Sequence, residues 1–393
     1  MTMTPLVLLS DEEFALRISH IREAMNEASV KQLLITDNAN LFYLTGRVYA
    51  GYAYIPAEGL PLFFIRRPSG LKGDGVVYIR KPEEMGQTLA LTIDGPLGLE
   101  LDLLPYSAVT RLDKAFGEIP FVNVSPLLRQ VRAVKTPAQI EEVRKSGIHH
   151  SFVYSRIPHI YREGMTDNEL QIEIERVARL EGCLGQFRIS GDTMEIYMGS
   201  LLVGKNAENP TPYDFAMGGA GMNPSLPVGS DGTLIASGNS VMVDMNGNFT
   251  GYMTDMTRTF RVGEVSPLAV KAHQCSIDIC CAVAKAGVPG TPAKQLYELA
   301  EKMVADAGLH EYFMGLHQKA GFIGHGVGIE INELPVIAPR SRDILQEGNV
   351  IALEPKFVIP KTGAVGIENT YVVRADDMEC LTKAPEEMIE LIK

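Results

Sequence analysis

The feature that most constrains this chain is a pair of carboxylates inside apolar, strand-like segments. Residues 241–260 read VMVDMNGNFTGYMTDMTRTF, where Asn246-Gly247, a dipeptide typical of hairpin turns, separates two apolar runs. Asp244 ends the first run and Asp255 lies in the second. Burying a carboxylate there is costly unless its charge is compensated, and a divalent cation can compensate it. Two exposed hairpin carboxylates are the alternative interpretation of this segment.

A second segment of the same kind favours the metal interpretation. Residues 349–373 read NVIALEPKFVIPKTGAVGIENTYVV, with Glu354 and Glu368 in two apolar runs on either side of a predicted turn at 361–363. Between the two segments, His325 is embedded in the glycine-rich sequence GHGVG. Four carboxylates and one imidazole can hold a pair of divalent ions, with carboxylates bridging them. The sequence therefore predicts a dinuclear metal site.

These residues and their neighbours resemble the family of aminopeptidase P, prolidase, methionine aminopeptidase and creatinase. The similar words are GYxxDxTRTF at 251–260, HGVGIExxELP at 325–335 and ALEP at 352–355, and the resemblance covers most of the chain. The metal ligands of that family correspond to Asp244, Asp255, His325, Glu354 and Glu368. The resemblance implies a catalytic domain with the pita-bread fold. Creatinase itself is a poor match, because it has abandoned the metal ligands that this chain keeps.

The resemblance also implies a role for each ligand. Asp244 would bind one ion, Asp255 and Glu368 would bridge the pair, and His325 and Glu354 would bind the other ion. Glu354 would in addition act as the general base toward a water that attacks an amide bond. The two ions would be manganese, cobalt, iron or zinc, because an oxygen-rich site with one imidazole accepts any of them. Arg258 is expected to be structural and to pair with a nearby carboxylate.

Three positions of the expected substrate pocket depart from the family pattern. Val228 and Asn332 stand where peptidases of the family have histidines, and Gly366 stands where Xaa-Pro peptidases often have an arginine. The histidines position the scissile amide, stabilise the oxyanion and protonate the leaving nitrogen, and one such donor is worth about 3 kcal/mol of barrier. No histidine lies between residues 160 and 272, so a different alignment of the loop does not restore the first one.

Three functions are consistent with this combination of retained ligands and altered neighbours. The first is a metal-dependent hydrolase of the Xaa-Pro aminopeptidase or dipeptidase type, acting on a small peptide or amide. The second keeps the metal site and uses it for a non-peptide C–N hydrolysis or a lyase reaction. The third is an inactive scaffold that binds a peptide or a partner protein, although buried carboxylates without a metal would repel one another. We expect the first.

The order of predicted elements indicates an α/β protein with two domains. Residues 1–125 are expected to form a small α/β domain resembling the N-terminal domain of creatinase, and residues 126–393 the pita-bread domain. Thr136-Pro137 marks a helix start. Each half of the larger domain reads helix, helix, carboxylate hairpin, which fits the pseudo-two-fold symmetry implied by the resemblance. The expected helices are 10–28, 107–116, 136–162, 169–181, 266–286 and 293–307, and 187–198 is expected to contain strand.

Composition restricts the partners and the compartment. The net charge of −12 argues against a nucleic-acid surface, and the sequence has no apolar run long enough to span a membrane. Five cysteines without a CxxC pattern and without a secretory signal indicate a reducing cytoplasm. The family resemblance adds a homodimer to these expectations.

Overall fold

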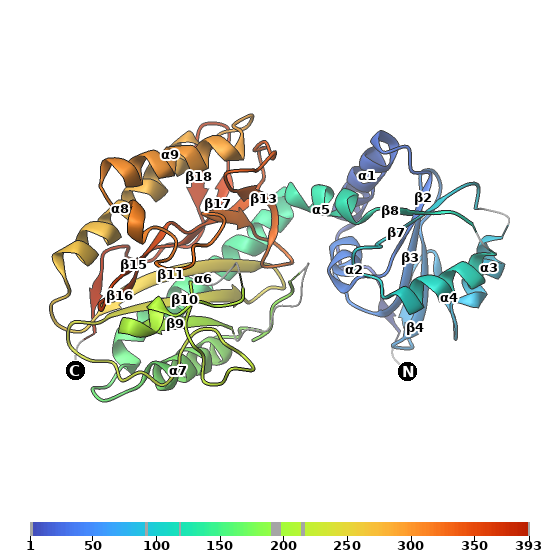
Figure 1. Cartoon of the computed structure of the whole chain (residues 1–393). Coiled ribbons are helices and arrows are strands. Elements are labelled where there is room, and N and C mark those ends of the chain that lie inside the picture. The colour runs from blue at the N-terminus through green and yellow to red at the C-terminus, as the bar shows by residue number, and fades with distance from the viewer. Residues whose placement is uncertain (1–2, 91–92, 118, 190–197, 214–216, 392–393) are drawn as a thin grey trace. The chain divides into compact units, whose positions relative to one another are not determined.

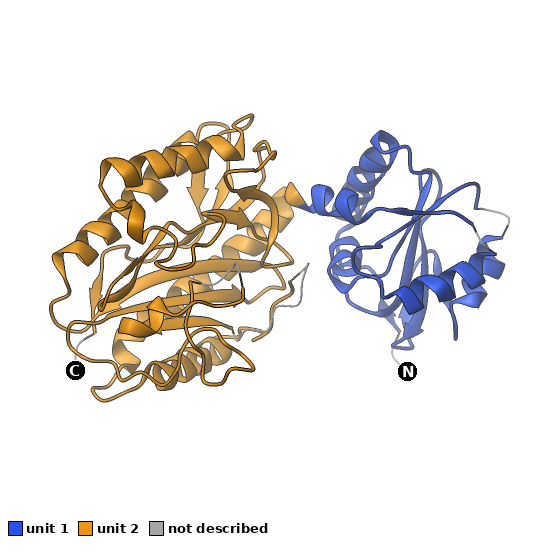
Figure 2. Cartoon of the chain, viewed as in Figure 1, with its two compact units in different colours: residues 1–132 blue, residues 133–393 orange. Residues whose placement is uncertain are grey.

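The computed structural model describes residues 3–90, 93–117, 119–189, 198–213 and 217–391. The chain divides into two compact units, residues 1–132 and 133–393 (Figure 2). The boundary expected at 125/126 falls at the start of helix α5 (Ser125–Ala133), whereas the division between the two units falls at the end of that helix. None of the helices formed by the described residues is both long and apolar enough to cross a lipid bilayer.

Unit 1 is built on a six-stranded mixed sheet in the order β6-β4-β3-β2-β7-β8. One face packs against α3 and α4 through Leu34, Phe64, Met85 and Leu112. The helices are α1 (Asp11–Glu27), α2 (Asn38–Thr45), α3 (Glu83–Leu89) and α4 (Tyr106–Phe116). The strands are β2 (Gln32–Ile35), β3 (Ala50–Pro56), β4 (Leu62–Arg67), β6 (Val76–Tyr78), β7 (Leu97–Leu99) and β8 (Phe121–Asn123), and β1 (Thr4–Pro5) pairs separately with β5 (Leu71–Lys72).

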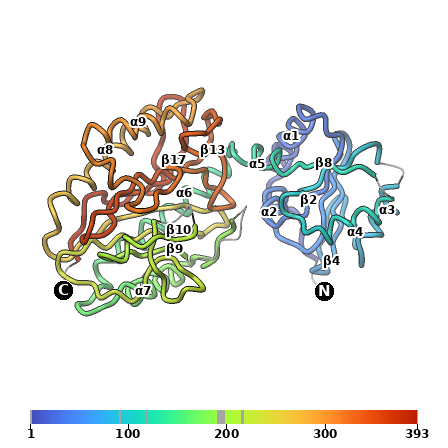
Figure 3. Tube along the Cα trace, viewed as in Figure 1, coloured from blue at the N-terminus to red at the C-terminus, as the bar shows by residue number. Residues whose placement is uncertain are grey.

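The described residues of unit 2 form three sheets, in the orders β19-β11-β10-β9, β13-β12-β14-β17-β18 and β15-β16 (Figures 1 and 3). Its helices are α6 (Pro137–Ile160), α7 (Asp167–Leu180), α8 (Pro267–Ala286) and α9 (Ala293–Asp306), with short 3-10 turns at Gly204–Glu208 and His310–Tyr312. Its strands are β9 (Gly199–Val203), β10 (Ser240–Asn248), β11 (Met253–Arg261), β12 (Gly324–Gly326), β13 (Glu333–Ile337), β14 (Val350–Leu353), β15 (Lys356–Ile359), β16 (Gly363–Gly366), β17 (Asn369–Val373), β18 (Met378–Cys380) and β19 (Ile389–Glu390).

The two halves of unit 2 repeat one plan. In the first half, α6 and α7 pack on β9–β11 through a core that includes Ile157, Ile174 and Val243. In the second half, α8 and α9 cover the later strands through a core that includes Ile279 and Ile351. Each pair of helices thus precedes a segment that contains two of the candidate carboxylates, as the order of predicted elements indicated.

Local sequence signals explain where the helices begin. The Ser10 hydroxyl accepts a hydrogen bond from the Glu13 amide at the start of α1. Thr136 and Gln139 form a reciprocal capping box at the start of α6, with Pro137 at the first helical position. The six helices expected from the sequence are therefore present. The predicted strand at 187–198 lies largely outside the described residues.

The predicted turn at Asn246-Gly247 is wrong. The pair lies inside β10, where Asn246 pairs with Asp255 and Gly247 with Thr254, and residues 249–252 make the turn instead. Glycine is required at 247 for packing, because an added Cβ would lie 2.7 Å from the His150 ring and 2.7 Å from Thr254 Oγ1. A glycine that allows a helix side chain to pack closely on a strand therefore looks, in the sequence, like a glycine in a turn.

His150 gives unit 2 a predicted sensitivity to acid. Its ring is buried, with Nδ1 3.0 Å from Thr254 Oγ1, and burial, assisted by the charge of Arg258, lowers its pKa from 6.5 to about 3. The folded protein therefore keeps the His150 ring neutral, whereas the unfolded chain binds a proton there below about pH 6.5. The unfolding free energy is unaffected by this group above pH 6.5 and falls as pH decreases from 6.5 toward 3. Between pH 7.5 and 5.5, wild type should lose about 1.4 kcal/mol more unfolding free energy than His150→Leu. Urea titrations at both pH values measure this, and parallel losses would contradict it.

The second carboxylate segment forms the predicted hairpin, but each of its apolar runs is divided between two sheets. Strands β15 and β16 pair with each other across the turn, whereas β14 and β17 pair in the five-stranded sheet. The chain changes sheet at Glu354-Pro355 and at Ile367-Glu368. Both glutamates therefore lie between strands, at the points where the chain passes from one sheet to the other.

Candidate metal centre

Strand register places the two aspartates side by side. Asp244 pairs with Thr257, and Asn246 pairs with Asp255, on antiparallel strands β10 and β11. Since side chains alternate along a strand, Asp244 and Asp255 lie on the same face as diagonal neighbours. Thr370 holds the Asp255 backbone, because its hydroxyl accepts from the Asp255 amide at 2.8 Å and donates to the Asp255 carbonyl at 2.9 Å.

The other sheet supplies the histidine and the glutamates. His325 lies on β12 and pairs with Ala352 of β14, the strand that ends just before Glu354. Glu368 joins the sheets, because its backbone forms a bridge with Thr257 of β11 and one side-chain oxygen accepts from the Thr257 hydroxyl at 2.8 Å. Residues distant in sequence thereby reach one buried centre.

The five predicted ligands form two overlapping groups. Asp255, His325 and Glu368 offer ligand atoms within 4.8 Å of one another, and so do Asp244, Glu354 and Glu368. His325 Nε2 lies 3.3 Å from a Glu354 oxygen and 3.9 Å from an Asp255 oxygen. Glu368 belongs to both groups, which is the arrangement that a bridging carboxylate requires.

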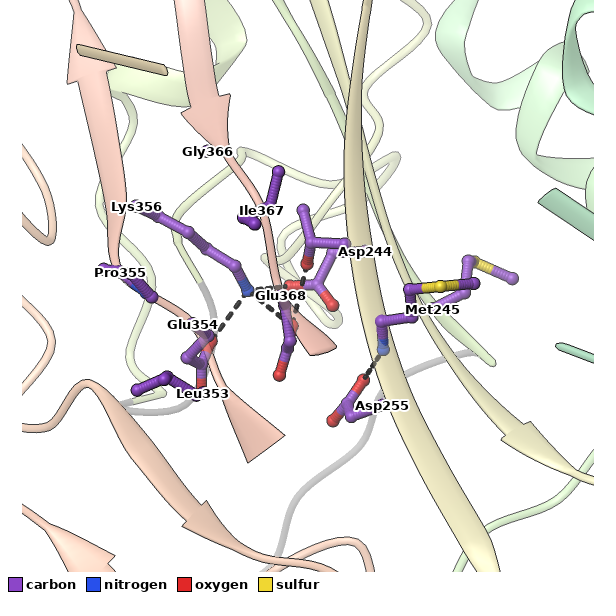
Figure 4. A network of polar contacts seen from close by, with 12 residues as sticks. Asp244, Met245, Asp255, Leu353, Glu354, Pro355, Lys356, Gly366, Ile367 and Glu368 are labelled. Carbon is purple, nitrogen blue, oxygen red and sulfur yellow. Dashed lines mark hydrogen bonds and ion pairs between the residues drawn. The ribbon is translucent and has the colours of Figure 1, made fainter. Parts of the chain in front are cut away.

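A sixth residue at the centre was not predicted. The side chain of Lys356, the first residue of β15, is fully buried and points between the carboxylates (Figure 4). Its Nζ atom is 2.7 Å from Glu354 Oε2, 2.8 Å from Asp244 Oδ2 and 3.0 Å from Glu368 Oε2. The three protons of the ammonium thus have three carboxylate acceptors. The second of the two ligand groups is filled by a lysine of the same chain.

Burial and the neighbouring charges raise the pKa values of Glu368 and Asp255 and lower that of Glu354. Burial, and then the charge of Glu354, raises the pKa of Glu368 to about 8. Burial also raises the pKa of Asp255 well above its usual value, with the charge of Glu368 adding to the effect. For Glu354, burial acts to raise the pKa, but the charge of Lys356 and the hydrogen bond from His325 prevail and lower it to about 2. The centre therefore combines one glutamate whose pKa is lowered with two carboxyl groups whose pKa values are raised, and a cation bound beside those two would lower them again.

The chemistry of the donors decides which half of the centre suits a metal ion. The group of Asp255, His325 and Glu368 fits a divalent ion, because Glu368 Oε1 is buried without a hydrogen-bond partner among the described residues. The His325 Nδ1 atom lies 3.0 Å from the Gly326 carbonyl and donates to it, so Nε2 is the ring atom that a metal would use. In this structure Nε2 faces a Glu354 oxygen at 3.3 Å, and a bound ion would take the place of that contact. The group of Asp244, Glu354 and Glu368 does not fit a second ion beside the Lys356 ammonium.

Arg258 supports the centre from behind, although not by the expected pairing with a carboxylate. The residue is 1% exposed. Its guanidinium donates to four backbone carbonyls and to an amide oxygen, on Thr257, Glu368, Asn369, Ala384 and Pro385. Two of these acceptors belong to the bridge between the sheets, so the arginine fastens the strands that carry Asp255 and Glu368.

The three predicted pocket positions lie on segments next to the ligands. Val228 is buried beside Gly229, and a Cβ added to that glycine would lie 3.5 Å from the Cβ atom of Ser200, the strand partner of Asp244. Asn332 is half-buried and immediately precedes β13, the neighbour of the strand that carries His325.

Gly366 lies directly opposite Lys356. The two residues pair on β16 and β15, and Gly366 has a φ of +143°. An added Cβ there would lie 2.9 Å from the Pro355 carbonyl oxygen and 3.0 Å from the Lys356 Cα atom. An arginine at this position would require the backbone around Lys356 to shift. Glycine at this position is therefore favoured by the close approach of the facing backbone.

Comparison with known families agrees with the two-domain fold. The model of metallopeptidase family M24 matches residues 141–375, and that of the creatinase/prolidase N-terminal domain matches residues 17–134. A Xaa-Pro dipeptidase of Pyrococcus horikoshii is 27% identical over 379 residues, covering 95% of this chain and 98% of that protein. An uncharacterised peptidase of Bacillus subtilis is 24% identical and covers 96% of this chain and 100% of that protein.

Solved structures confirm the architecture. A prolidase from Pyrococcus horikoshii superposes with a TM-score of 0.77 at 24% identity, covering 95% of this chain and 100% of that one. A Xaa-Pro dipeptidase from Bacillus anthracis superposes with a TM-score of 0.80 at 23% identity, covering 96% and 99%. The expected pita-bread fold with a creatinase-like N-terminal domain is thus confirmed. Since the M24 model spans more than half of the chain and its match contains all five predicted ligands, the chain belongs to metallopeptidase family M24.

Proposed function

We propose that this chain is a metal-dependent hydrolase that cleaves an amide bond of a small, peptide-like substrate, in the manner of a Xaa-Pro dipeptidase. The observation that supports this most is the convergence of Asp255, His325, Glu354 and Glu368 at one buried centre in an M24 fold. A divalent ion bound there would lower the pKa of a water molecule and polarise the substrate carbonyl. Family membership supports a metal cofactor, and similar proteins include Xaa-Pro dipeptidases.

The protein groups have distinct tasks in this proposal. Glu354 is the general base, because one carboxylate oxygen lies beside the His325 ring and the other is fixed by Lys356. Asp255, His325 and Glu368 would hold the ion. Lys356 neutralises part of the carboxylate charge and keeps Asp244, Glu354 and Glu368 in place. Manganese as the ion and a homodimer are carried over from the family resemblance, and metal titration and sedimentation velocity would test them. The proposed cytoplasmic location rests on the cysteine pattern.

A second substrate class has specific support. Val228 and Gly366 bring no hydrogen-bonding side chain to the pocket, and Asn332 can donate a hydrogen bond but cannot shuttle a proton. A substrate whose leaving group needs no protonation by the enzyme suits such a pocket better than a peptide does. A non-peptide C–N bond, broken by hydrolysis or by elimination, is therefore the alternative.

A substrate screen with a matched inactive variant tests the proposed function. Purified protein supplied with Mn²⁺, Co²⁺ or Zn²⁺ would be assayed on Ala-Pro, on Ala-Ala and on cyclic and acyclic non-peptide amides, beside Asp255→Asn. Hydrolysis of Ala-Pro that disappears in the variant supports the dipeptidase proposal. Turnover of a non-peptide amide alone supports the alternative. The absence of all turnover under every metal condition would leave the binding scaffold.

Restoring a histidine at position 228 should increase peptide cleavage. In Val228→His, an imidazole on the loop beside Ser200 and Asp244 can donate to the developing oxyanion, and such donors change rates by about 100-fold. Because the new donor is not preorganised by its neighbours, we expect a smaller gain of roughly tenfold in kcat/KM for Ala-Pro. Val228→Phe, which has similar bulk and no donor, should show no gain. A decrease in both variants would mean that the pocket is shaped for a different substrate.

A further inference from the structure

The position of Lys356 determines how many ions the centre can hold. Three carboxylates, from Asp244, Glu354 and Glu368, form one of the two candidate ligand groups of unit 2. The same three carboxylates surround the Lys356 ammonium at 2.7 to 3.0 Å. These distances are those of charged hydrogen bonds, whereas a divalent transition metal binds carboxylate oxygens at about 2.0–2.2 Å. The three carboxylate oxygens are therefore at hydrogen-bonding distance from the Lys356 Nζ atom, which occupies the position that a metal ion would need.

Lys356 is also held in place along its backbone. Its amide donates to the Met314 sulfur at 3.4 Å, and its carbonyl accepts from the Met314 amide at 2.9 Å. Gly366 packs against its Cα atom from the opposite strand. The side chain is fully buried, so displacing the ammonium would leave a buried charge without its partners, which costs several kcal/mol. A second divalent ion would have to displace it.

The remaining half of the centre has the opposite character. Glu368 uses one oxygen for Lys356 and Thr257, and its other oxygen is buried without a partner among the described residues. The Asp255 and His325 side chains lie in this part of the centre, with His325 Nε2 3.9 Å from an Asp255 oxygen, and the ion pairs of Lys356 are with the other carboxylates. An unpartnered buried carboxylate oxygen with an imidazole and a second carboxylate nearby is a donor set that suits a divalent cation.

We propose that the Lys356 ammonium replaces one of the two metal ions of the family, and that the chain binds a single divalent ion on Asp255, His325 and Glu368. The lysine supplies a fixed positive charge on the Asp244 side, which no chelator can remove. This inference rests on the metal centre of the proposed function and specifies its composition. It concerns binding alone, so it stands or falls independently of which bond is cleaved.

Counting ions tests the inference without an activity assay. Wild type dialysed against Mn²⁺ should contain one ion per chain by mass spectrometry, and its electron paramagnetic resonance spectrum should be that of an isolated Mn²⁺. In Lys356→Ala, three buried carboxylates lose their cation, so we expect a second ion and the spectrum of a coupled pair. Circular dichroism with and without Mn²⁺ shows whether this variant folds. Two ions in wild type, or none, would overturn the inference.

Asp244→Asn provides a control that does not depend on the folding of Lys356→Ala. In a dinuclear centre, Asp244 is a ligand, and its loss would reduce the ion count from two to one. With Lys356 in that position, Asp244 touches the ammonium and not the ion, so the count should remain one in both wild type and variant. A fall in the count in Asp244→Asn would contradict the inference. Bound metal without hydrolysis would reject the proposed function alone.

Discussion

Glutamine in place of Glu354 should abolish hydrolysis while the fold survives. The Glu354 oxygens lie 3.3 Å from His325 Nε2 and 2.7 Å from Lys356 Nζ, so the carboxylate sits between the candidate ion site and the fixed ammonium. A carboxamide of the same shape cannot accept a proton, and the loss of a general base costs about 10²–10⁴-fold in rate. We expect kcat to fall by about 10³-fold or to below detection. Steady-state kinetics on the substrate identified by screening measures this.

The fold should tolerate that change because Lys356 keeps two carboxylate partners, Asp244 and Glu368. Circular dichroism and a thermal melt would verify this. Glu347→Gln, an isosteric change at an exposed position just before β14, is the matched control and should leave kinetics and melting unaltered. Activity that persists in Glu354→Gln would remove Glu354 from the role of base and direct attention to another group.

Methionine in place of Arg258 should cause the largest loss of stability among single substitutions near the centre. The guanidinium is buried, and its hydrogen bonds reach both sheets through Thr257 and Glu368. Removing it leaves several buried acceptors unsatisfied, each worth about 1–3 kcal/mol. We expect the unfolding free energy to fall by about 3–5 kcal/mol, because several of these acceptors lose their donor at once. Urea-induced unfolding followed by circular dichroism measures the difference.

Arg261 gives the matched control on the same strand. It forms an ion pair with Glu390 at 2.9 Å, but the two side chains are 33% and 37% exposed. Exposed pairs of this kind contribute about 0–1 kcal/mol, so Arg261→Met should be nearly neutral. Equal losses in Arg258→Met and Arg261→Met would show that buried connectivity between the sheets does not account for the effect.

The two glycines of the first carboxylate hairpin illustrate how a local pattern can be ambiguous. Asn246-Gly247 has the signature of a hairpin turn, yet the glycine serves to let His150 approach β10. The true turn, at 249–252, contains Gly251 with a φ of +92°. Gly251 is favoured by the local backbone conformation of the turn, whereas Gly247 is favoured by a contact with a residue distant in sequence. Packing against a helix a hundred residues earlier leaves no mark that separates it from a turn.

Lys356 was open to the same reasoning that identified the carboxylates. It begins the apolar run KFVI, and a charged residue in a buried strand needs a partner whether it is an acid or a base. Its place immediately after Glu354-Pro355, close to a predicted turn, is equally typical of a surface residue. What the sequence could not show is that three carboxylates from three different segments meet at its ammonium.

Local patterns in the sequence were enough to predict the helices and to single out four carboxylates and a histidine in apolar segments, because periodicity, caps and charges are encoded in short stretches. The family and its fold followed from the resemblance of the motifs around those residues. What the five side chains contact depends on the tertiary structure. Asp244 and Glu354 are oxygen ligands in any sequence-based account, but the folded chain brings the Lys356 ammonium to both of them. The physical reason is that a carboxylate accepts a metal ion or an ammonium equally well by type, and only the arrangement of strands from two sheets determines which cation lies within reach.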